Sequence, residues 1–306
     1  MIGHGVTVLL SLLAAVFLAI GIVVRQRATI DVPAEQGVSA KMVLTLIRRP
    51  LWWAGTAAAV AGYVFQALAL ANGSLLLVQP ILVSALLFAL PLSARLAHRR
   101  VTRAEWAWAL LLTAALAVFV VLAKPSPGDY EASLSTSAIV AVVCTVLVMA
   151  CVVVALRSTD WRRAVLLAVA VGVLFGVVAV LTKLFMHVLT HEGLLTVMIT
   201  PVPYLLVVLG VIAVLLQQSA FHAGSLQTSV PTMLTLEPVI AVILGAVVLG
   251  EELDVSRLDA VALTVATLAM AAGTIALGRD EGAYEERLTA PAGTEPAERQ
   301  AASGTE

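Results

Sequence analysis

Glu237 is the residue best suited to chemistry, because it is a carboxylate inside a long apolar run. That run belongs to the stretch Gln217–Glu252, which opens on polar residues and a Gly-Ser turn and ends in Gly-Glu-Glu. An ionisable side chain within a hydrophobic span is costly in lipid and indicates a functional site. Low dielectric disfavours the charged form of a carboxyl group, so Glu237 could load and release a proton, or it could bind a cationic substrate. It could equally be a protonated side chain that caps a carbonyl freed by the adjacent Pro238.

Lys183 and several glutamines are further polar groups at membrane depth. Lys183 could pair with Glu237 or attract an anionic substrate, or its ammonium could extend to the outer membrane interface. The glutamines could line a polar pathway or form hydrogen bonds between helices. They are Gln66, Gln79, Gln217 and Gln218.

Prolines interrupt the apolar runs and are predicted helix-break sites. A proline frees a backbone carbonyl and permits a break that can serve gating or ligand contact, although a harmless kink is the alternative. The candidate positions are Pro80, Pro231 and Pro238.

Glu251 and Glu252, with Asp254, are expected to form an acidic mouth on the outer side. Carboxylate oxygens near one another are the ligands that Mg²⁺ prefers, but an ordinary solvated loop has the same composition. His187 and His191 stand four residues apart beside Glu192 and resemble half a metal site, although the helix is expected to end there. The chain contains no Walker motif, HExxH or nucleophile elbow, so we predict no enzyme, no cofactor and no bound metal.

The composition requires a membrane protein. Hydrophobic residues make up 61% of the chain and charged residues 12%, against about 25% charged residues in soluble proteins. Apolar runs of roughly 20 residues recur, which is the length of a membrane-spanning helix. Because these runs are continuous rather than alternating, we predict an all-α polytopic membrane protein and not a barrel. Nothing in the charge pattern suggests nucleic-acid binding.

Nine spans are expected, and the basic residues between them set their orientation. The loops after spans one, three and five hold twelve Lys and Arg residues, whereas the opposite side holds Lys124 and Arg257. By the positive-inside rule the N-terminus is outside and the C-terminus is cytoplasmic, in the plasma (inner) membrane. The predicted transmembrane domain covers residues 1–278, and a disordered acidic tail covers 279–306, which has seven acids and three arginines.

An internal repeat organises the spans. Gln66–Pro80 aligns without gaps on Gln217–Pro231, matching a glutamine, a Gly-Ser-Leu triplet and the final proline. The two copies would cross the membrane in opposite directions. We therefore predict two inverted four-helix repeats, residues 1–124 and 164–278, joined by a linker helix at 134–156, with a substrate site near the midplane as in transporters.

The segment LTLEPVIAVILGAVVLGEEL resembles the EamA-type signature of the drug/metabolite transporter superfamily, in which a proline enters an apolar helix and Gly-Glu follows. The segments AIGIVVRQRA, WWAG and ALALANGSLLLVQPI resemble the NIPA branch of that superfamily. The likeness covers nearly the whole membrane part. It implies nine spans, the orientation given above, a possible homodimer and, for the NIPA branch, magnesium transport. Arg99 and Arg100 stand where superfamily members often have an acidic residue, which leaves magnesium open.

These observations predict a secondary active transporter that moves a small polar or cationic metabolite or drug by alternating access. Proton-coupled export through Glu237 is the expected mechanism. The alternatives are a NIPA-like Mg²⁺ transporter and a non-transporting membrane partner protein. The expected partners are the lipid bilayer and a small-molecule or cation substrate.

Overall fold

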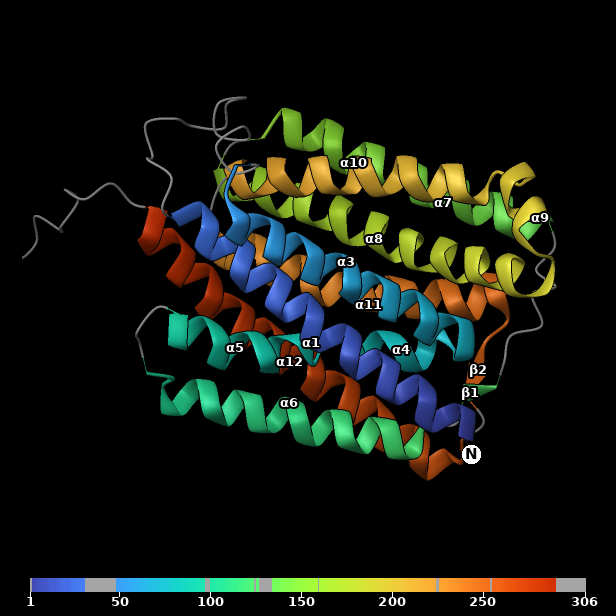
Figure 1. Cartoon of the computed structure of the whole chain (residues 1–306), viewed down its shortest axis with the longest axis horizontal. Coiled ribbons are helices and arrows are strands. Elements are labelled where there is room, and N and C mark those ends of the chain that lie inside the picture. The colour runs from blue at the N-terminus through green and yellow to red at the C-terminus, as the bar shows by residue number, and fades with distance from the viewer. Residues whose placement is uncertain are drawn as a thin grey trace, which may run out of the picture.

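A computed structural model describes residues 2–30, 48–96, 100–123, 125–126, 134–158, 160–223, 226–253 and 255–289. Helices account for nearly all of these residues, and the helix axes follow the long direction of the molecule (Figure 1). The helices are α1 (Ile2–Ile30), α3 (Pro50–Asn72), α4 (Leu75–Leu82), α5 (Ala85–Leu96), α6 (Arg103–Leu122), α7 (Leu134–Leu156), α8 (Asp160–His191), α9 (Leu194–Ile199), α10 (Val202–Ala223), α11 (Leu226–Leu249) and α12 (Arg257–Thr289). Two short strands, β1 (Pro125–Ser126) and β2 (Glu252–Leu253), pair antiparallel.

The fold confirms the predicted all-α polytopic membrane protein. By length and composition, eight candidate spans lie in the described residues, and α10 adds a shorter apolar stretch, Val202–Gln217. A helix satisfies its own backbone groups, which lipid requires. The least buried span is in α7, so this helix presents most of its surface to lipid. The exact count of nine and the inverted repeat stay predictions.

Close approaches at glycine join the long helices. In α8, a Cβ placed on Gly172 would lie 2.8 Å from the Cβ of Leu236, and one on Gly176 would lie 2.5 Å from Ile240 Cγ2. The two glycines are four residues apart and therefore share a face of α8, which packs directly on α11. Small residues at this spacing let two membrane helices approach closely. Gly21 of α1 is packed in the same way, against Ala59 of α3.

The predicted third span is two helices, because α4 ends at Leu82 and α5 begins at Ala85. Val83 and Ser84 form a turn between them, three residues after Pro80. Figure 1 shows α4 nearer the end of the molecule where β1 and β2 lie, with α5 beyond it. We call this the β1–β2 end. A second break separates α9 from α10 at Thr200 and Pro201. It lies near two prolines, Pro201 and Pro203, that interrupt the apolar run of this span.

The breaks predicted at Pro231 and Pro238 are wrong. Helix α11 runs without interruption from Leu226 to Leu249. Pro231 lies in its second turn, where its missing N–H removes a single intrahelical bond near the start of the helix. Pro238 is in the helix interior, between Leu236 and Ile240, which pack on Gly172 and Gly176 of α8. The helix break therefore occurs in the span of the first copy of the repeat, which begins at Gln66, and not in the span of the second copy, which begins at Gln217.

Helix α12 extends beyond the predicted end of the membrane domain. It continues to Thr289, although disorder was expected from residue 279. The extension is rich in Glu, Arg, Ala and Leu, which favour helix, and lengthening an existing helix avoids the cost of nucleation. Residues 290–306 lie outside the described part of the chain.

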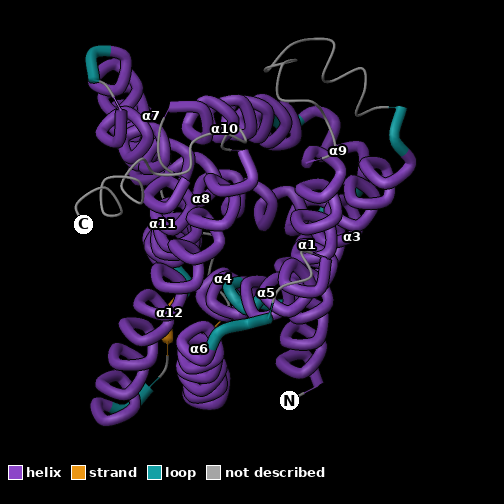
Figure 2. The backbone as a smooth tube through the Cα atoms, turned by 90° about the vertical axis from the view of Figure 1, so that its left-hand side faces the viewer, coloured by secondary structure: helices purple, strands orange, loops and turns teal. Residues whose placement is uncertain are grey.

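The helices α8, α11 and α4 form the centre of the bundle. α8 contacts α7, α10 and α11, while α11 also contacts α12 and α4. On the other side α1 packs on α3 and on α4 and α5, and α6 packs on α12. Figure 2, which looks along the bundle, shows α4 and α5 lying between these groups. The broken span thus lies where the two halves of the chain meet.

Candidate functional site

Glu251 is directed into the protein by the turn that ends α11. Gly250 has φ +66°, a left-handed conformation that glycine adopts at low cost. This turn lets the Glu251 N–H donate to the carbonyl of Gly245 at 3.1 Å. Gly245 leaves room for the carboxylate, since a Cβ there would lie 3.0 Å from Glu251 Oε2 and 3.1 Å from Leu75 Cβ. The side chain of Glu251 consequently reaches the beginning of α4.

The carboxylate of Glu251 caps α4. Its Oε1 accepts the N–H of Leu75 at 3.0 Å, and its Oε2 accepts the N–H of Leu76 at 3.2 Å. Ser74 Oγ accepts the N–H of Leu77 at 3.3 Å. The N–H groups of Leu75 and Leu76 have no partner within the helix, whereas the Leu77 N–H also donates to the carbonyl of Ser74 at 3.2 Å. The N-terminus of a helix favours a negative charge. Glu251 is 1% exposed, so the helix end provides much of the polar environment that water would otherwise supply.

Lys183 of α8 completes the arrangement. Its Nζ lies 3.1 Å from Glu251 Oε1, and it also donates to the carbonyl of Leu70 at 3.4 Å and to the carbonyl of Gly73. These carbonyls belong to the last turn of α3 and the turn after it, where a positive charge is favoured. Lys183 is 5% exposed. We call Lys183, Glu251 and the backbone groups of Leu70, Gly73, Leu75 and Leu76 the Lys183–Glu251 cluster.

The cluster corrects two sequence predictions. Glu251 was expected in a solvated acidic mouth, but it is buried. Lys183 was expected to pair with Glu237 or to extend to the interface, but it pairs with Glu251. The missed signals were Gly245 and Gly250, which make space and turn the chain, and the Gly-Ser turn at Gly73, which presents backbone partners for both charges.

Glu252 keeps the predicted exposure, and its backbone belongs to β2. It is paired in register with Ser126 of β1. Asp254 lies outside the described residues, as does the side chain of Gln218.

Glu237 lies deeper than the cluster along α11. Gly245, about two turns after it, contacts α4 at Leu75 and Leu76. Eight residues turn a helix by about 80° beyond two full turns, so Glu237 lies beside that contact face. Eight residues of helix separate Glu237 from Gly245, which is about 12 Å at 1.5 Å per residue. Eight residues inward from Leu75 is Val83, at the break between α4 and α5. Glu237 is half-buried, and the described residues offer it no hydrogen-bond partner.

Three buried polar atoms without hydrogen-bond partners lie near the depth of Glu237. Within the described part of the chain, Gln79 Nε2, Ser84 Oγ and Thr235 Oγ1 have none. Gln79 and Ser84 are both 2% exposed, and they flank the end of α4. Unpartnered buried polar groups are rare in native proteins, and each one calls for a water or a ligand as its explanation. Two other predicted glutamines are more exposed than Gln79, because Gln66 is 8% exposed and Gln217 is half-buried.

The two histidines of α8 share a face, because the helix continues to His191 instead of ending before it. Their rings stack with centroids 4.4 Å apart, and His191 Nδ1 lies 3.0 Å from the carbonyl of His187. Among the described residues, no group of three His, Cys, Asp or Glu side chains is placed to hold a metal ion.

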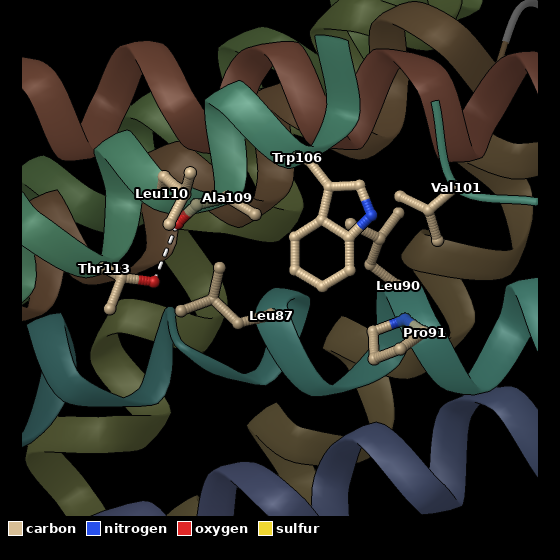
Figure 3. Close-up of a pocket in the computed structure, with 8 residues that line it drawn as sticks. All are labelled: Leu87, Leu90, Pro91, Val101, Trp106, Ala109, Leu110 and Thr113. Carbon is tan, nitrogen blue, oxygen red and sulfur yellow. Dashed lines mark hydrogen bonds between the residues drawn. The ribbon is translucent and has the colours of Figure 1, made fainter. Parts of the chain in front are cut away.

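A separate cavity of about 90 Å³ lies between α5 and α6. Figure 3 shows that Leu87, Leu90 and Pro91 face Trp106 across it. Its polar groups are the indole of Trp106 and the hydroxyl of Thr113, which donates to the carbonyl of Ala109 at 2.7 Å. The cavity is therefore suited to apolar atoms, and it contains none of the predicted site residues.

The apolar helices define the class, a polytopic α-helical membrane protein, and its largely apolar interior contains a buried charged cluster. The chain is 36% identical over 272 residues to an uncharacterized protein of Corynebacterium glutamicum, a match that covers 89% of this chain and 94% of that protein. It belongs to the same family as that protein. No family model matches the chain, and no solved structure matches it. The resemblance to drug/metabolite transporters stays a prediction.

Proposed function

We propose that the protein is a secondary active transporter that moves a small polar or cationic molecule across the plasma membrane by alternating access. The observation that carries this proposal is the set of unpartnered polar atoms of Gln79 and Ser84 at the break between α4 and α5. A structural helix bundle gains nothing from buried polar groups that lack hydrogen bonds, since each costs about 1–3 kcal/mol. A pathway needs such groups to replace the hydration of a passing substrate. Broken helices at a pathway supply further backbone groups for the same purpose.

Glu237 is the proposed coupling residue. By helical rise it lies at about the depth of the break, beside the α11 face that packs on α4, and no described side chain of opposite charge neutralises it. A carboxyl group in that position can exchange a proton with the pathway or bind a cationic group of the substrate. Both roles require a charge that is free to change partners, which distinguishes Glu237 from Glu251.

The packing of the two halves supports an inverted repeat. α1 packs on α3 and on the broken span α4–α5, and α8 packs on α10 and on α11. In each half the first helix therefore contacts the second and the third. The Gly73-Ser74 turn precedes α4, and the aligned Gly224-Ser225 lies between α10 and α11. With the basic loops on the cytoplasmic side, the β1–β2 end would face outward.

Flux into proteoliposomes tests the function. Purified protein is reconstituted, a pH gradient is imposed, and uptake is measured for a panel of amines, zwitterionic metabolites and Mg²⁺. We expect gradient-dependent movement of an organic substrate that Glu237→Gln reduces at least tenfold. The matched control is Glu192→Gln, which neutralises an exposed carboxylate in the turn after α8 and should leave flux unchanged. Flux of Mg²⁺ alone would favour the NIPA-like alternative, and no flux of any compound would reject the proposal.

A further inference from the structure

The Lys183–Glu251 cluster connects the two halves of the chain at the β1–β2 end. Both charged side chains come from the second half, and their hydrogen-bond partners Leu70, Gly73, Leu75 and Leu76 all belong to the first half. The pairing of β1 with β2 adds a second connection at the same end. Pathway residues Gln79 and Glu237 lie about one and two helical turns deeper.

We propose that the Lys183–Glu251 cluster is the outer gate of the transport pathway, closed in this structure, and that it must separate from the α3–α4 turn whenever the pathway opens outward. This inference rests on the proposed function. Lys183 and Glu251 act in it as positioning residues that hold α4 against α11, and neither is assigned to substrate.

The bonding pattern allows the gate to open as one unit. Every first-half partner is a backbone group in the single segment Leu70–Leu76, so one displacement of that segment breaks all four hydrogen bonds together. Packed elements of this kind switch between discrete arrangements instead of deforming gradually. Lys183 and Glu251 can keep each other as partners when the segment leaves, because their 3.1 Å contact lies within the second half.

The chemistry of the cluster also suits reversible hydration. Opening exposes an ammonium, a carboxylate, two N–H groups and two carbonyls, and water satisfies every one of them. Closing replaces that water by groups of opposite charge or dipole at the ends of α3 and α4. Leu70, Leu75 and Val78 also pack in a buried apolar cluster with residues of α8 and α11, so opening has a hydrophobic cost as well. Water offsets the loss of the polar contacts but not that of the apolar ones.

Accessibility of a buried reporter tests the gate without measuring transport. Cys144 and Cys151 are first replaced by alanine, and Val78→Cys is introduced one turn beneath the cluster, at a position that is 0% exposed. Intact cells are treated with a membrane-impermeant maleimide, and the labelling rate is compared between variants. We expect slow labelling with the gate intact and at least tenfold faster labelling in Glu251→Gln, because the loss of one partner leaves the buried Lys183 ammonium uncompensated only in the closed state.

A second variant keeps the test informative if Glu251→Gln does not fold. Gly245→Ala keeps both charges but places a Cβ 3.0 Å from Glu251 Oε2, so it should also raise the labelling rate. Glu192→Gln removes an exposed carboxylate in the turn after α8 and should not. Monodisperse elution in detergent shows which variants are folded.

Unchanged labelling in the folded gate variants, or an equal rise in Glu192→Gln, would overturn the gate. Labelling of Val78→Cys only from the cytoplasmic side would overturn its placement at the outer end. Failure of the proposed function is a different result, namely a wild type that moves no substrate in proteoliposomes whatever its labelling rate.

Discussion

Replacing Lys183 by methionine should destabilise the folded protein by about 3 kcal/mol. The ammonium lies 3.1 Å from Glu251 Oε1 and both side chains are at most 6% exposed, so the substitution leaves a carboxylate buried without its counter-charge. At an effective dielectric of 20 the direct attraction at this distance is about 5 kcal/mol. The loss should be smaller, because the N–H groups of Leu75 and Leu76 continue to bind the carboxylate. Breaking one side of a buried pair typically costs about 3–5 kcal/mol, and we expect the lower end of that range.

Equilibrium unfolding in mixed detergent micelles measures this value, with loss of helix followed by circular dichroism. The matched control is Arg257→Met, which removes an exposed cation at the start of α12 and should change the free energy of unfolding by less than about 0.5 kcal/mol. The double variant Lys183→Met with Glu251→Gln should lose less than the sum of the two single variants, since it leaves no unpaired charge. The reasoning is refuted if Lys183→Met is no more destabilising than Arg257→Met, or if the two single effects are additive.

Two further predictions concern the helix contacts and the pathway. Gly176→Leu should separate α8 from α11 and lower the free energy of unfolding by about 1–3 kcal/mol or more, because even a Cβ at this position would lie 2.5 Å from Ile240 Cγ2. The control is Gly210→Leu, which should be nearly neutral in the same unfolding assay because a Cβ there meets nothing within 4 Å. Gln79→Leu should leave stability unchanged or higher, since it removes an unpartnered buried amide, yet it should reduce proteoliposome flux strongly; wild-type flux in this variant would argue against a pathway at the α4–α5 break.

The architecture was largely predictable because lipid leaves few options. Apolar runs of about 20 residues had to be helices, and the loops between them could be located from their charge and their Gly and Pro content. Residue-level pattern was less informative inside the spans. Pro238 suggested a break in α11, but tertiary packing keeps that helix continuous. The break came in the other copy of the repeat, at Val83 and Ser84, three residues after the predicted site Pro80.

The candidate site was only partly predictable, for a specific physical reason. Glu237 and Gln79 could be identified because a polar side chain in an apolar run is conspicuous. Glu251 could not, since it follows the end of its helix and looks like a loop acid. Its burial depends on the φ of Gly250, on the space left by Gly245 and on the beginning of α4. The beginning of α4 is far from Glu251 in the sequence, so the local pattern around Glu251 does not reveal the contact. Lys183 was noticed, but its partner depends on the alignment of α8 with α11 along their axes, which only packing determines.

The backbone origin of the first-half contacts has a consequence for how this family can vary. Lys183 and Glu251 bind main-chain atoms of Leu70–Leu76, so these hydrogen bonds do not depend on which apolar side chains that buried segment carries. Relatives should therefore retain the lysine and the glutamate opposite a segment that varies only among residues that fit its buried surroundings, with no compensating changes between the halves at this point. A search for covarying residue pairs would miss the strongest polar connection described between the two halves.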